Sequence, residues 1–208
     1  MAALFASAMS AASDIVFWAT GEKLTTAAIV PAVLLVAASL AAIYISTLGI
    51  IGRKTSWAGY LRFAGISAAM LAPLGVVLTF AISTKADFTE SARVLGLLLG
   101  LLISFFLVSL LSCWPIAQSL SAAFVSPVQI WRKTRGHRLS LITASLILNG
   151  LKRADFIPEI AKAQDVVSAS VIAIANGLLN VVVLALTAAV AAAAWELQRE
   201  TEAARLSE

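Results

Sequence analysis

Formal charge is what this sequence has least of. Of its 208 residues, only 12% are Asp, Glu, Lys or Arg, whereas 61% are apolar. Soluble domains carry roughly 25% charged and about 45–50% apolar residues. This composition does not fit a soluble globular domain, and it predicts an integral membrane protein.

Reactive residue types are equally scarce. The chain has one cysteine, Cys113, and one histidine, His137, which excludes an internal disulfide and gives no set of zinc ligands. His137 stands among arginines and is expected to be a solvated loop residue. For Cys113 a buried thiol is favoured, and a lipid-acylated one is the alternative. No phosphate-binding glycine loop, zinc-protease motif or nucleophile elbow occurs. The sequence therefore predicts no catalytic residue, no metal site and no cofactor.

Long stretches without charge are what the sequence does contain. They predict an all-α, polytopic membrane protein with four transmembrane helices, at about residues 26–51, 63–84, 94–115 and 167–195. Each stretch is long enough, because about 20 helical residues cross a hydrocarbon core roughly 30 Å thick. The apolar runs are continuous, which favours helices over the alternating strands of a barrel. The whole chain, 1–208, is interpreted as a single membrane domain.

The third stretch is the longest, since no charge occurs between residues 94 and 131. Its crossing is expected to end at Trp114-Pro115, because tryptophan favours the headgroup level and proline marks a kink. The segment that follows, 116–165, is interpreted as a cytoplasmic amphipathic loop. Within it, residues 139–151 are apolar but too short to span, which predicts an interfacial or re-entrant helix.

Both ends of the chain predict further helix. Residues 1–19 repeat apolar positions at near-helical spacing, which is typical of a short helix lying in the membrane interface. After the last span, Glu196 and Arg199 form an i,i+3 pair, so the helix is expected to continue beyond the membrane.

Basic residues set the expected orientation. Ten of the fifteen Lys and Arg residues fall in two loops, the one after the first span and the loop 116–165. Cytoplasmic loops carry an excess of these residues. We therefore predict a protein of the bacterial inner membrane with these two loops in the cytoplasm and both termini outside it.

Small residues mark faces for close helix packing. Gly96 and Gly100 form a GxxxG motif inside the third span, and Ala169, Ala173 and Gly177 form a similar ridge on the last. Two helix backbones can approach closely where side chains are small. These five residues are candidate helix contacts, either with a partner or within this chain.

Asn176 and Asn180 form a polar pair near the middle of the last span. They are four residues apart and share one helix face. An amide in lipid must find hydrogen-bond partners, so the pair is expected to face protein or water. It either holds helices together or lines a polar pathway.

Positive charge is concentrated in one short part of the loop, at Arg132, Lys133, Arg135 and Arg138. Such a cluster is a candidate surface for anionic lipid headgroups or for a protein partner. Nucleic acid is the least expected of its partners.

Together these features predict a non-enzymatic, multipass inner-membrane subunit of a larger envelope assembly, of secretion or conjugation type. It would act by packing its helices against lipids and other membrane protein subunits. The four spans hold no Asp, Glu, Lys, Arg or His, which argues against an ion-coupled carrier. The alternative is a small oligomeric passive channel or carrier lined by Asn176 and Asn180.

Overall fold

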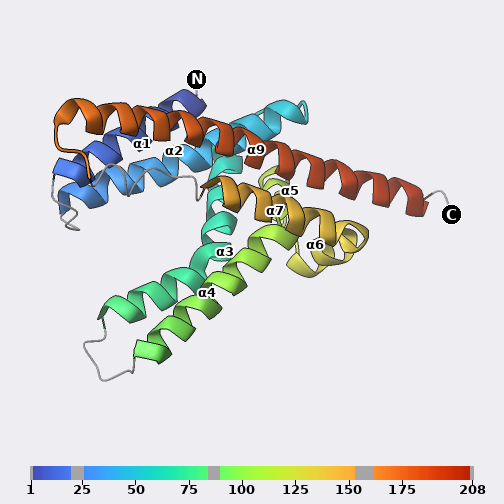
Figure 1. Ribbon diagram of the computed structural model, residues 1–208. Helices are drawn as coiled ribbons and strands as arrows, with labels where there is room; N and C mark the ends of the chain where they lie inside the picture. The colour runs from blue at the N-terminus through green and yellow to red at the C-terminus, as the bar shows by residue number, and fades with distance from the viewer. Residues whose placement is uncertain (1, 20–25, 84–89, 153–161, 207–208) are drawn as a thin grey trace. The chain divides into compact units, whose positions relative to one another are not determined.

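The computed structural model describes residues 2–19, 26–83, 90–152 and 162–206 (Figure 1). Every regular element in these ranges is a helix, so the predicted all-helical class is confirmed. The chain forms two compact units. Unit 1 comprises Met1–Thr55 and Leu146–Val190, and unit 2 comprises Ser56–Ser145 and Ala191–Glu208.

Unit 1 is built mainly from three long helices: α1 (Ala2–Ala19), α2 (Thr26–Ile50) and the first part of α9 (Val166–Leu206). Helix α1 packs along α2. The core between these helices is made of small side chains and one leucine: Ala6, Ala38, Ala42 and Leu184. Alanines at a helix contact let the backbones approach closely, which is how helices gain packing energy in a membrane.

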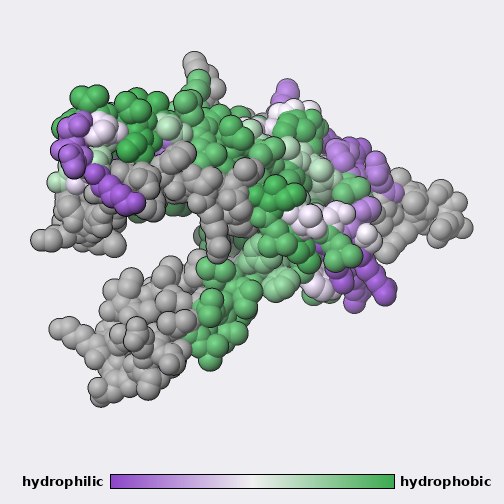
Figure 2. Space-filling model, in the orientation of Figure 1, coloured by the Kyte–Doolittle hydropathy of each residue, from purple (hydrophilic) through white to green (hydrophobic). Residues whose placement is uncertain are grey.

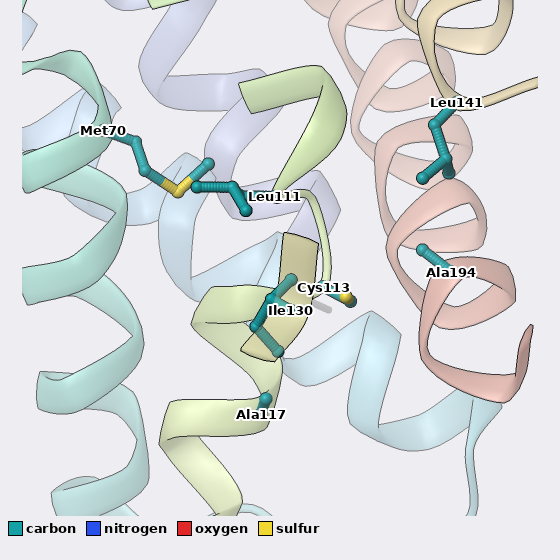
Figure 3. Close-up of a cluster of buried hydrophobic side chains, with 7 residues drawn as sticks. All are labelled: Met70, Leu111, Cys113, Ala117, Ile130, Leu141 and Ala194. Carbon is teal, nitrogen blue, oxygen red and sulfur yellow. The ribbon is translucent and has the colours of Figure 1, made fainter. Parts of the chain in front are cut away.

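Unit 2 combines long and short helices. It contains α3 (Trp57–Ser83), α4 (Glu90–Leu110), α5 (Trp114–Leu120), α6 (Pro127–Lys133), the 3-10 turn η1 (Arg135–His137), the start of α7 (Arg138–Lys152) and the end of α9. Helix α3 packs against α4 and α5. Figure 3 shows the core of this unit, which consists of Met70, Leu111, Cys113, Ala117, Ile130, Leu141 and Ala194. Cys113 is buried and free, as favoured from the sequence.

Two helices are each long and apolar enough to cross a membrane, over Val33–Ile50 in α2 and Val166–Glu200 in α9. The pair Leu98–Leu110 and Trp114–Leu120 passes the same test together, with a bend of 54° between the two helices. The described residues thus support a helical membrane protein with two or three candidate spans. The expected span 63–84 falls in α3. Residue 84 and several side chains of this span lie outside the described residues.

The break expected at Trp114-Pro115 is present. Helix α4 ends at Leu110, and α5 begins at Trp114 with Pro115 in its first turn. Proline is tolerated there because the amide of a first-turn residue has no helical partner to lose. The Trp114 amide donates to the Leu111 carbonyl at 2.8 Å, and this hydrogen bond stabilises the turn between the two helices.

The shorter expected helices are also found. Helix α1 accounts for residues 2–19 of the expected N-terminal helix, and α7 accounts for residues 139–151. Helix α9 continues past the last predicted span to Leu206. On that extension Arg199 lies 3.4 Å from Glu196, as their spacing predicts.

Candidate functional site

The small-residue ridge of α9 is occupied by the chain's own α1. Ala169 and Ala173 are buried. A Cβ atom added to Gly177 would lie 2.9 Å from both the carbonyl and the hydroxyl oxygen of Ser7. Only glycine permits this approach. On α4, which packs against α3, Gly100 is buried and Gly96 is half-buried.

The two asparagines of the predicted polar pair have different surroundings. Asn176 is buried, and its Nδ2 donates to Oδ2 of Asp14 at 2.8 Å. Asn180 is half-buried. Near the C-terminal end of α1, the indole nitrogen of Trp18 donates to the carbonyl of Ala163, which lies just before α9, at 3.1 Å. Asn176 therefore serves a contact between α1 and α9.

Asp14 is a functional candidate that sequence reasoning missed. The spans themselves hold no Asp, Glu, Lys, Arg or His, but α1 brings the half-buried Asp14 carboxyl group against Asn176 of the last predicted span. That span therefore has an acidic side chain beside it, although it contains none. A carboxyl group away from water needs hydrogen bonds to offset its desolvation, and the Asn176 amide supplies one. The available signal was the spacing of Ser7, Ser10 and Asp14, which share one face of an otherwise apolar helix.

The four basic residues of the loop have different surroundings. Arg132 and Arg135 are exposed. Arg138 is held in place, because its Cζ lies 3.9 Å from the centre of the Trp131 ring and its Nη2 donates to the Trp131 carbonyl at 2.9 Å. Lys133 is half-buried and lines a cavity.

That cavity lies in unit 2 and has a volume of about 250 Å³. It is lined by the end of α5, the segment after it, α6 and residues 195–199 of α9. Its lining residues are Ala117, Leu120, Ser121, Val125, Gln129, Ile130, Lys133, Trp195, Gln198 and Arg199. Figure 2 shows hydrophilic residues gathered over α6 and over the part of α9 that precedes its grey C-terminal end, and hydrophobic residues over α4.

Side chains hold the irregular backbone that forms one wall of this cavity. Gln118 is buried and makes two contacts: its Nε2 donates to the Ala123 carbonyl at 3.0 Å, and its Oε1 accepts from the Val125 amide at 2.8 Å. The Trp114 indole donates to the Val125 carbonyl at 2.7 Å. Such bonds are needed because backbone groups outside a helix have no regular partner.

The cavity bears on the predicted orientation. The positions of the basic residues assign Lys133 to the cytoplasm, and the count of four crossings places Arg199 outside. In unit 2 the two residues line the same cavity, so their assignment to opposite membrane faces is not supported. The number of apolar runs cannot show that Lys133 and Arg199 lie together. The length of a run does not say which later segment brings the chain back to the same membrane face.

No group of three or more His, Cys, Asp or Glu side chains within the described ranges could hold a metal ion. Comparison with known protein families, curated proteins and solved structures gives no match.

Proposed function

We propose that this chain is a non-enzymatic, multipass inner-membrane subunit of a larger envelope assembly, of secretion or conjugation type. The observation that carries the proposal is the uncovered apolar face of α4. On that helix Leu98, Leu99 and Ile103 are each about half exposed, at 53%, 50% and 50%. Exposed apolar area costs roughly 25 cal/mol per Å² in water, so this face needs lipid or another subunit against it.

The contacts made inside the chain favour this face over the small-residue ridges as the partner surface. Gly177 is already in contact with α1, and Gly100 is buried. These ridges therefore serve assembly of the chain itself. The larger side chains of α4 remain available for contacts with neighbouring subunits. Such contacts depend on shape complementarity and dispersion rather than on close approach of helix backbones.

A photo-crosslinking residue introduced into α4 tests the proposal. At Leu99 or Ile103 it is expected to give protein adducts of discrete mass in native membranes. At Ser104, which is only 3% exposed, the same residue provides the matched control and should give none. A stable lone monomer in mild detergent, with lipid adducts alone from Leu99 and Ile103, would overturn the proposal.

The proposal also revises one part of the predicted orientation. It keeps the basic loop in the cytoplasm and the N-terminus outside, but it places the last turns of α9 with the loop, because Lys133 and Arg199 line one cavity. Single cysteines at Arg135 and Glu200, in a Cys113→Ser background, should react with a membrane-impermeant thiol reagent from the same side. Labelling from opposite sides would support the orientation predicted from the sequence, with Arg135 in the cytoplasm and Glu200 outside it.

The alternative of a passive channel lined by Asn176 and Asn180 has less support. The Asn176 amide is already engaged with Asp14. Replacing both asparagines with leucine is expected to weaken packing, with no loss of solute flux beyond that caused by reduced assembly. Flux abolished in a variant that is fully assembled would favour the channel.

A further inference from the structure

One residue that lines the cavity of unit 2, Gln198, has a side-chain nitrogen for which the described residues supply no hydrogen-bond partner. Gln198 is only 4% exposed, and its Nε2 is buried without a hydrogen-bond acceptor. A buried donor left unpaired is costly, and native structures generally satisfy such groups. Gln198 lines the cavity, so an acceptor placed in the cavity would complete the site.

The charge of the lining indicates what kind of acceptor fits. The lining contains two cations, Lys133 and Arg199, and no carboxylate. Arg199 does contact Glu196 at 3.4 Å, but both side chains are about half exposed, and such surface pairs are weak. An anion would gain charge-assisted hydrogen bonds from both cations in addition to the Gln198 amide.

The position of the cavity along α9 indicates where that anion comes from. Glu196 is the first charged residue after thirty uncharged ones, 166–195. Trp195 immediately precedes it and lines the cavity, and tryptophan is enriched at the headgroup level. The cavity therefore lies where a hydrophobic span meets the polar layer of the membrane.

We propose that this cavity binds the phosphate group of an anionic membrane lipid. Gln198, Lys133 and Arg199 are the donors, and Leu120, Val125 and Trp195 contact the upper part of the acyl chains. At about 250 Å³, the cavity is smaller than the roughly 300–1,000 Å³ that enclose whole ligands, so it accepts a headgroup and leaves the chains in the bilayer. The lipid source rests on the proposed membrane location, whereas the phosphate chemistry rests on the cavity alone.

Native mass spectrometry of the detergent-solubilised protein tests the proposal, with phosphatidylglycerol titrated against phosphatidylcholine. The wild type should retain one phosphatidylglycerol in preference to phosphatidylcholine. Lys133→Gln should weaken that binding about fivefold, which corresponds to about 1 kcal/mol for one basic residue near the anionic headgroup. The matched control is Arg132→Gln, which removes the same charge from the neighbouring exposed residue and should leave the retained lipid in place.

Gln198→Met is the sharper variant because it removes the donor without changing the net charge. It should weaken phosphatidylglycerol binding by about tenfold, as expected for loss of a hydrogen bond to a charged group. Its elution volume and helix content should match the wild type, which verifies folding. Equal lipid binding by the wild type, Lys133→Gln and Gln198→Met would overturn the proposal.

A second arm separates lipid from free phosphate. Inorganic phosphate and glycerol phosphate are titrated against the bound lipid. Failure of both to displace it at millimolar concentration supports the lipid source. Displacement by inorganic phosphate at concentrations similar to those of the lipid would keep the anion site and overturn the lipid source. Binding of an acidic peptide, with no phosphate compound bound in any arm, would overturn the proposal as a whole. Should the chain fractionate as a peripheral protein, the proposed function would fail, and the inorganic phosphate arm would still test the cavity.

Discussion

The two units satisfy their backbone hydrogen bonds in different ways. Unit 1 consists mainly of long helices whose backbones bond within themselves. Its contacts combine close approach, through alanines and Gly177, with side-chain hydrogen bonds such as that from Asn176 to Asp14. Unit 2 includes an interrupted segment between α5 and α6, whose free backbone groups are bonded by Arg62, Trp114 and Gln118. Where the helix is continuous, its backbone needs no such support, and where it breaks, polar side chains must replace the missing backbone bonds.

The largest expected effect is in unit 2, at Gln118. Gln118→Leu removes the partner of the Val125 amide and of the Ala123 carbonyl, two part-buried hydrogen bonds, and each group left unsatisfied costs about 1–3 kcal/mol where water does not reach it. We expect the free energy of unfolding in detergent to fall by about 3 kcal/mol by the same reasoning. Gln129→Leu, at an exposed glutamine of the same unit, should change it by less than about 0.5 kcal/mol. Equal effects of the two substitutions would contradict the role assigned to Gln118.

In unit 1 the corresponding weak point is Gly177. Gly177→Ala places a methyl group 2.9 Å from the Ser7 carbonyl and hydroxyl oxygens, so α1 must move away from α9. Such overpacking costs about 1–3 kcal/mol, measurable as a lower unfolding temperature. Gly65→Ala in α3 meets no atom within 4 Å and should be neutral or stabilise by up to about 1 kcal/mol. A destabilising Gly65→Ala with a neutral Gly177→Ala would refute the close approach.

A smaller effect is expected from the polar pair of unit 1. A double-mutant cycle with Asp14→Ala and Asn176→Ala should give a coupling energy of about 1 kcal/mol, within the roughly 0.6–2 kcal/mol measured for such contacts in membranes. The cycle is read from unfolding free energies in detergent. Asn180→Ala provides the control and should show no coupling to Asp14→Ala. Coupling at Asn180 equal to that at Asn176 would mean that Asp14 has no specific partner.

Sequence reasoning predicted helices well and contacts poorly, for a physical reason. Uncharged runs and the Trp114-Pro115 pair are signals of local structure. The break at Trp114 and the helix beyond Trp195 could therefore both be expected. The pairing of Asp14 with Asn176 joins residues 162 positions apart, and hydrophobic periodicity contains no information on which face meets which. For the same reason Gln198 could not be assigned to the cavity from the sequence. Its neighbour there, Lys133, is distant along the chain.

The smallest effect is expected at Asp165, just before the first turn of α9. Its Oδ1 accepts from the Ser168 amide at 2.7 Å, and this bond lowers the pKa of the carboxyl group below its ordinary value of 3.8. The ionised form is thus the one that stabilises the folded helix. Its contribution is present at pH values above 3.8 and is lost as the pH falls through the lowered folded pKa.

Asp165→Ala should therefore reduce the unfolding temperature slightly at neutral pH, and the difference from the wild type should vanish in acid. Asp165→Asn is the control, because asparagine caps a helix about as well as aspartate without titrating. It should keep most of the neutral-pH stability and show less dependence on acid. A difference between wild type and Asp165→Ala that grows as the pH falls would have the wrong sign for a carboxylate cap.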